Sequence, residues 1–585
     1  MPRFEPVMAL RDRALVAILS VALIALSVAA LAPSLHSADQ TPEPTGGAPD
    51  GRGYVEGVLG RATNASPFGA RSAADRGLVA LLFRGLVHLG PDSSITADLA
   101  SSWEVDETGS RWTFHLRPDQ RWQDGEPITA GDVAFTVGVL SDPTYDGPGA
   151  ASWRDVRASV IDPMTVVLEL STPLGGFLQA ATQPIAPAHL LEFLPPDELA
   201  TDPFGQQPVG SGPFRLVFLD TSRAFLAAAT PVDPPAEGPG VPNFSTPRPT
   251  DSLASPRPTA KADVAIPYLS TFELRYYDDA GALLADWQAE ELDAVSGIQP
   301  ADVARFRTLA GSRLVRYPGT TLLATALNLR AGHTEFQDPA VRTALLEAID
   351  RDALVSLALP GVGTRADSLI PPTSPMFDAA KSAPVEFNLA EASRALRAAG
   401  WKQGNDGWTP KGAKEPIIIE LLSPEQFANP VAYATAAAIV ESWHALGLAV
   451  RQVPLPASEL LGDRVATGEF QVAVLPFAIG LDPDVYPLLA SSQTRTGGSN
   501  VIGLQDLDLD ALLVAARSPV AEAARHAAYG ALQERLAARQ YILPLAFRDD
   551  YVLFRDTVVG PESRSIGSPG DRYWDVLTWR LADGS

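Results

Sequence analysis

The stretch RWTFHLRPDQRWQDGEPITAGDVAFTVGVL, residues 111–140, carries the strongest local structural signals in the chain. In its first six residues Trp112, Phe114 and Leu116 alternate with polar or charged residues, which is the period of a half-buried β-strand. The segment SSWEV at 101–105 precedes it across a polar turn, so the two pieces predict a β-hairpin. We therefore expect residues 101–116 to form two strands of a sheet, with a structural role.

The second half of the stretch predicts a turn and a helix start. Asp124 and Gly125 form a typical tight-turn pair, and Thr129 with Asp132 has the spacing of a helix capping box. An enzyme would need Asp124, Asp132 or Glu126 as paired carboxylates for acid–base chemistry. Acids at a turn and at a cap are already occupied by backbone N–H groups, so the sequence favours a scaffold over a catalytic site.

The composition of the whole chain excludes several function classes. The 585 residues exceed what one hydrophobic core holds, so two or three lobes are expected. A formal charge of −24 disfavours nucleic acid as a partner. There are no cysteines, and the seven histidines lack the spacing of metal ligands. Phosphate-binding and nucleophile motifs are absent as well, so we expect neither an enzyme nor a bound metal or cofactor.

The N-terminus predicts targeting to a membrane. An uncharged apolar run at 14–32 follows three arginines and is long enough to cross a bilayer as a helix. The favoured interpretation is a retained anchor that places residues 33–585 outside the cytoplasm, and the alternative is a signal cleaved near Ala38 that releases a secreted or periplasmic protein. Residues 33–52, rich in Pro and Gly, are expected to be a flexible linker.

The remaining chain alternates strand and helix signals, which indicates an α/β fold. We expect strands on both sides of Asp162-Pro163, a buried strand at 320–330 and a helix over 338–358. Gly400 and Gly447 are expected to end two further helices. The segment 231–260 carries nine prolines and one aromatic residue, so it predicts a disordered surface insertion in place of core.

Seven collinear segments resemble one protein family, the family 5 extracytoplasmic solute-binding proteins of ABC importers, which bind oligopeptides, dipeptides or nickel. The segments are LLFRGLV (81–87), the long block at 95–136, PVGSGPFRLV (208–217), ALNLR (326–330), DPAVRTALLEAIDRDALV (338–355), LDPDVYPLL (481–489), and Asn500 followed by LDLDALLVAA. Together they cover most of residues 54–560 in the family's order.

This resemblance implies a periplasmic-binding-protein-like type II fold (cluster C), with two α/β lobes joined by a two-strand hinge and an extra lobe. Lobe I would comprise residues 53–84, 183–326 and 541–585, the extra lobe II residues 85–182, and lobe III residues 327–540. A peptide or small organic solute would be enclosed between lobes I and III and delivered to an ABC permease and its ATPase. We expect such a protein to be a monomer. The alternative is a membrane-tethered scaffold or sensor that keeps the fold without transport.

The family resemblance also nominates the solute-binding residues. Peptide-binding relatives carry an Asp three residues before the acidic-Pro pair, where it holds the ligand's amino group; here that pair is Asp482-Pro483 and the position is Ile479. An isoleucine would leave a buried ammonium without its counter-ion. The candidate ligand-binding residues are Asn64, Ser66, Asn328, Phe477, Ile479, Asp482 and Asn500. Each has a structural alternative, such as a turn for Asn64 or a helix cap for Asp482.

Overall fold

The computed structural model describes residues 53–90, 94–229, 267–495, 497–518 and 521–582. They all belong to the second of the two units into which the chain divides, which begins at residue 53. The predicted anchor at 14–32, the linker at 33–52 and the insertion at 231–260 therefore lie outside the described residues. Within the described ranges, every helix is too short or too polar to cross a membrane.

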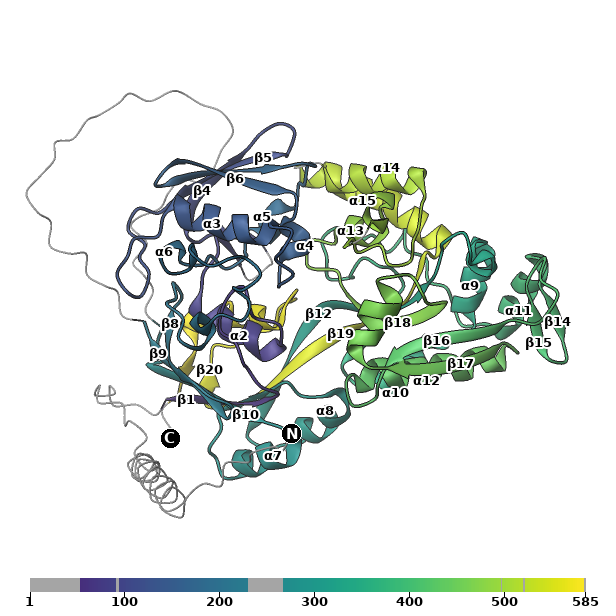
Figure 1. Cartoon of the computed structure of the whole chain (residues 1–585). Coiled ribbons are helices and arrows are strands. Elements are labelled where there is room, and N and C mark those ends of the chain that lie inside the picture. Colours follow the sequence, from purple (N-terminus) through teal and green to yellow (C-terminus); the bar gives the residue numbers. More distant parts are fainter. Residues whose placement is uncertain (1–52, 91–93, 230–266, 496, 519–520, 583–585) are drawn as a thin grey trace, which may run out of the picture. The chain divides into compact units, whose positions relative to one another are not determined.

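One large sheet runs through the second unit, and eleven strands of the described residues take part in it. In spatial order they are β17 (Ala449–Leu455), β16 (Ile418–Pro424), β18 (Val472–Ala478), β12 (Ser312–Leu327), β19 (Ile542–Arg555), β11 (Ala294–Ser296), β1 (Tyr54–Leu59), β10 (Thr271–Tyr277), β9 (Arg223–Ala228) and β8 (Phe214–Leu219), with β13 (Gly363–Arg365) also paired to β19. Figure 1 shows the long strands β12 and β19 side by side. These are the two segments from which the hinge is expected.

The β12–β19 pairing is antiparallel, with register shifts between Tyr317 and Thr321 and between Leu323 and Ala324. Tyr317 lies opposite Asp550 and Thr321 opposite Arg548, so residues 318–320 bulge out of the ladder. Gly319 leaves room for this bulge, since a Cβ there would lie 2.1 Å from the carbonyl oxygen of Arg548. A bulge of this kind bends and twists a strand locally.

A second sheet contains the stretch from which the sequence analysis began. Its order is β4 (Ala100–Val105), β5 (Arg111–Leu116), β7 (Thr165–Leu170) and β6 (Val156–Asp162), all antiparallel. The β4–β5 hairpin, the buried alternation along β5 and the turn at Asp162-Pro163 confirm the predictions. Thr129 and Asp132 form the predicted capping box of α3 (Ala130–Ser141). Short pairs elsewhere are β2 (Val87–Leu89) with β3 (Ile95–Ala97), β14 (Lys402–Gly404) with β15 (Gly407–Thr409), and β20 (Val558–Val559) with β21 (Arg580–Leu581).

The helices follow the predicted signals with one correction. Helices of eight or more residues besides α3 are α2 (Ala73–Leu82), α7 (Ala280–Gln288), α9 (Pro339–Glu347), α10 (Arg351–Ala358), α11 (Leu389–Ala398), α12 (Pro430–Ala445), α14 (Leu507–Arg517) and α15 (Glu522–Arg539). Gly400 and Gly447 follow α11 and α12 with positive φ, as predicted. The single helix expected over 338–358 is wrong: the chain breaks between α9 and α10, where Asp350 accepts a hydrogen bond from the N–H of Ala353 and begins a new helix.

Buried apolar side chains of the described residues form two clusters, and strands β1, β12 and β19 contribute to both. The first includes β12, β16, β18 and their covering helices, and the second includes β1, β10 and the four-stranded sheet. At the heart of the second cluster Glu56 is fully buried and pairs with Arg572, with N···O distances of 2.5 and 3.2 Å. Tyr54 and Ser296 also donate to this carboxylate, so the charge is satisfied in the core.

Candidate functional site

The end of β18 and the loop that follows it carry three apolar side chains next to strand β12. We call these residues, Phe477, Ile479 and Leu481, the apolar wall. Phe477 pairs with Leu322 of β12, and the N–H of Ile479 donates to the carbonyl of Thr320 at 3.4 Å. Phe477, Ile479 and Leu481 are 7%, 6% and 8% exposed. The strand pairing thus brings Ile479, the residue at the amine-anchor position, directly against the bulge of β12.

Two carboxylates of the same loop are each neutralised by an arginine. Asp482 pairs with Arg525 of α15 at 2.7 Å, and Asp484 pairs with Arg517 of α14 at 3.1 Å. Burial raises the pKa of Asp484, and the nearby Arg517 acts against that rise. The loop therefore carries two carboxylates that are already paired, beside apolar side chains that are almost fully buried.

The helix-cap alternative for Asp482 is wrong. The short helix α13 (Tyr486–Leu489) begins at Tyr486, whose backbone N–H donates to the Asp484 carboxylate at 3.1 Å. The Asp482 carboxylate instead accepts a hydrogen bond from the guanidinium of Arg525. The acid that accepts from this helix start is therefore Asp484, two residues after the predicted Asp482.

Asn328 and Asn500 lie at the other end of β18. Residue pairs Thr321–Ala478 and Leu327–Val472 mark the two ends of the β12–β18 ladder. Six residues of strand span roughly 20 Å, so Asn328 is far from Ile479. The Asn328 amide donates to the carbonyls of residues 468 and 470 at 2.9 and 2.7 Å.

The side-chain amide of Asn500 is buried, and its hydrogen bonds go to backbone groups. It donates to the carbonyls of Leu489, Ala490 and Leu504 and accepts from the N–H of Leu504. This geometry fixes the loop that leads into α14.

Asn64 and Ser66 form a turn in front of α2. Asn64 accepts from the N–H of Ser66 at 2.8 Å and donates to the carbonyl of Ala200 at 3.0 Å, while Ser66 accepts from the N–H of Phe68. Of the seven nominated residues, the structure thus brings together Phe477, Ile479 and Asp482. The role of all seven in binding stays a prediction.

Sequence analysis missed a group of hydrogen-bond donors next to the apolar wall. The segment after β20 runs beside the β12 bulge, where the N–H of Ile566 donates to the carbonyl of Pro318 at 2.9 Å. A Cβ built on Gly567 would lie 3.6 Å from Leu481, so the segment also approaches the loop. The strand and helix patterns used above give no signal there, because the segment folds mainly as irregular chain and 3-10 turns.

Four buried donors of this region have no hydrogen-bond partner among the described residues. They are the Tyr317 hydroxyl, the Thr320 hydroxyl, Nε of Arg564 and Nε1 of Trp574. The guanidinium of Arg564 lies 5.2 Å from the centre of the Trp574 ring. Buried polar groups are normally satisfied. Eight further buried side-chain atoms of the described residues also have no partner, so these four do not by themselves mark a binding site.

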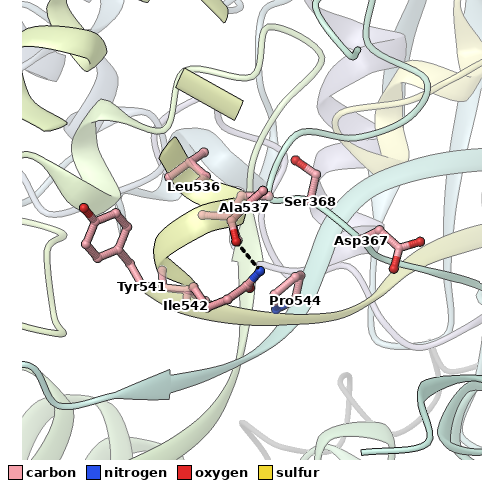
Figure 2. Close-up of a pocket in the computed structure, with 9 residues that line it drawn as sticks. Asp367, Ser368, Leu536, Ala537, Tyr541, Ile542 and Pro544 are labelled. Atoms are coloured by element: carbon pink, nitrogen blue, oxygen red, sulfur yellow. Dashed lines mark hydrogen bonds between the residues drawn. The ribbon is translucent and has the colours of Figure 1, made fainter. Parts of the chain in front are cut away.

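A small surface pocket lies elsewhere, where α15 leads into β19. Figure 2 shows Asp367, Ser368, Leu536 and Tyr541 around it. The space available to the centre of a water molecule is about 10 Å³, enough for a single water. It is too small for an organic solute.

The described residues hold no cluster of three or more His, Cys, Asp or Glu side chains that could bind a metal ion. His189 contacts Asp124 at 2.8 Å, and Asp132 accepts from the N–H of Ala188, so these acids serve structural contacts.

Comparison with known proteins identifies relatives over nearly the whole chain. The oligopeptide-binding protein AppA of Bacillus subtilis is 22% identical over 581 residues, covering 98% of this chain and 99% of AppA. The structure of AppA from Bacillus subtilis in complex with a nonapeptide matches with a TM-score of 0.69 at 21% identity, over 91% of this chain and 99% of AppA. NikZ from Campylobacter jejuni in complex with Ni(L-His) matches with a TM-score of 0.69 at 20% identity, over 90% of this chain and 99% of NikZ.

These structures confirm the predicted fold class, a periplasmic-binding-protein-like α/β fold. The family model described as bacterial extracellular solute-binding proteins, family 5 (middle), matches residues 94–500. That match spans well over half of the chain and includes the stretch at 111–140 and the loop that carries Ile479. The protein belongs to the family 5 bacterial extracellular solute-binding proteins.

Proposed function

We propose that this chain captures a peptide or a related organic solute outside the cytoplasm and delivers it to the permease and ATPase of an ABC importer. The family match over residues 94–500 carries this role, and AppA, which is similar along its full length, is an oligopeptide-binding protein. The comparisons support this role over that of a tethered sensor. The anchor at 14–32, the monomeric state and the three-lobe division are parts of the proposal.

The contacts around Ile479 support a particular chemistry of the solute. A buried ammonium group needs an unpaired carboxylate, but Asp482 and Asp484 are held by Arg525 and Arg517. Tyr317 and Trp574 supply buried donors that have no partner among the described residues. We therefore propose a solute that presents carbonyl or carboxylate oxygens here and places no free amino group against the loop.

Matched peptides test this chemistry. Thermal unfolding of the full-length protein should be measured with pools of peptides of two to nine residues, each supplied with a free and with an acetylated N-terminus. A solute present at 100 times its Kd adds about 2.7 kcal/mol to the free energy of unfolding. We expect both forms to stabilise the protein equally. Stabilisation by the free-amine form alone would refute the proposed chemistry, and stabilisation only by non-peptides would refute the peptide class.

Two variants sharpen the test. Tyr317→Phe removes a hydroxyl that has no partner in the described part of the chain, so unfolding without solute should be unchanged while solute affinity falls about fivefold to tenfold. Ile479→Asp should instead shift the preference toward the free-amine peptide. If Tyr317→Phe leaves affinity intact, the unpaired donors do not contact the solute.

A further inference from the structure

A glycine turn of the four-stranded-sheet segment packs directly on the acidic loop described above. The turn, Gly175-Gly176, lies between β7 and the short helix α5 (Phe177–Ala180). The N–H of Gly175 donates to the carbonyl of Arg517, the last residue of α14, at 2.7 Å. Residues more than 300 positions apart in sequence thus meet through a backbone hydrogen bond.

Gly176 is required here for space. A Cβ at this position would lie 1.2 Å from Oδ2 of Asp482 and 2.9 Å from the guanidinium of Arg525. The backbone angles of Gly176, φ −89° and ψ 13°, are accessible to any residue. An alanine at 176 therefore meets no backbone strain of its own, and its whole effect falls on the ion pair.

The ion pairs under the turn are well buried and unite three elements. Asp482 and Arg525 have side chains 10% and 13% exposed, and Asp484 and Arg517 join the same loop to α14. The Arg517 guanidinium also lies 4.3 Å from the centre of the Tyr486 ring. The stability of a buried ion pair depends on good geometry, so moving Asp482 should weaken its pair with Arg525 and disturb the neighbouring pair of Asp484 and Arg517.

We infer that the Gly175-Gly176 turn is a positioning element, by which the 85–182 segment holds the 481–485 loop and, through it, the apolar wall of Ile479 and Leu481. It acts through Asp482 and Arg517 and touches no solute itself. A second contact of the same segment, Asp155 with Arg495 at 3.9 Å, is exposed and contributes little. Of these two contacts, the turn is the one that lies on buried side chains. This inference goes beyond solute capture and holds whatever the solute is.

Hydrogen–deuterium exchange of the full-length protein without solute tests the link. In Gly176→Ala, amides in peptides covering 171–180 and 481–490 should exchange about tenfold faster than in the wild type, the scale of coupling between residues in contact. The matched control is Gly138→Ala in α3, where a Cβ would meet nothing within 4 Å. It should leave both peptides unchanged. Faster exchange confined to 171–180 would overturn the inference.

A double-mutant cycle locates the effect at the clash. Asp482→Ala alone frees Arg525 and should loosen the 481–490 peptide. Adding Gly176→Ala to Asp482→Ala should then have little further effect, because the carboxylate oxygen 1.2 Å from the new Cβ is gone and the guanidinium of Arg525, released from its partner, can move away. Additive effects would show that Gly176 acts elsewhere and would overturn the inference. Solute is absent from both experiments, so their failure would leave the proposed function standing, and failure of the peptide screen would leave this inference standing.

Discussion

Asp575 has a buried carboxylate that makes stability depend on pH. Its oxygens accept from Nε1 of Trp579 at 2.6 Å and from the N–H of Glu562 at 2.9 Å, and burial raises its pKa to about 6. Because the folded protein then holds this proton more tightly than the unfolded chain does, the group's contribution is greatest below about pH 4 and is lost as the pH rises through about 6.

Replacing this carboxyl should flatten the dependence. From pH 5 to pH 7 the wild type should lose about 1 kcal/mol of unfolding free energy relative to Asp575→Asn, which keeps an acceptor for Trp579. Denaturant titrations of both proteins at the two pH values measure the difference. Parallel curves for the two proteins would contradict the assignment.

The candidate site was predictable only where a residue's role follows from its neighbours in sequence. Ile479 could be assigned to the position where peptide-binding relatives carry an Asp, because that position is counted back from the Asp482-Pro483 pair. The strand pairing then brings Ile479 next to the hinge strand β12. The partner of Asp482 could not be predicted, because Arg525 comes from a helix more than forty residues later. Asn328 and Asn500 look like ligand groups in sequence, yet their amides bond to backbone that only the fold brings near.

Among the secondary-structure elements, the bulge in β12 should be sensitive to a small change. A methyl group at Gly319 would be driven against the carbonyl of Arg548 in β19. Gly319→Ala should therefore lower the free energy of unfolding by about 1–3 kcal/mol, as other overpacked sites do. Gly332→Ala, where a Cβ meets nothing within 4 Å, is the control and should stay within about 0.5 kcal/mol. Equal loss in both variants would argue against the contact.

Elements with their own start and stop signals were predicted well. The capping box at Thr129 and the glycines after α11 and α12 act within one turn of helix, so sequence alone identifies them. The break between α9 and α10 was missed because the apolar spacing continues through Ala348 and Ile349, while Asp350 turns the chain. The order of strands in the large sheet has no local signal and was not predicted, because the family resemblance implied only the fold class and a two-strand hinge.

For the whole molecule, the predicted insertion at 231–260 should be dispensable. The chain leaves the sheet at the end of β9 and returns on the adjacent strand β10, and the N–H of Ala228 donates to the carbonyl of Ser270 at 2.9 Å. A chain with residues 231–260 removed still has enough residues to join the two strands. We expect its thermal midpoint and solute affinity to match the wild type. A marked loss of either would assign the segment a role in folding or binding.

Strand β19 fills the middle of the large sheet, between β12 and β11, although it is encoded near the end of the chain. During translation, the strands on either side of it emerge first and have no common neighbour. The folding protein must therefore keep two open sheet edges from pairing wrongly until residues 542–555 are available. Completion of the fold is consequently a late event, set by the arrival of one strand.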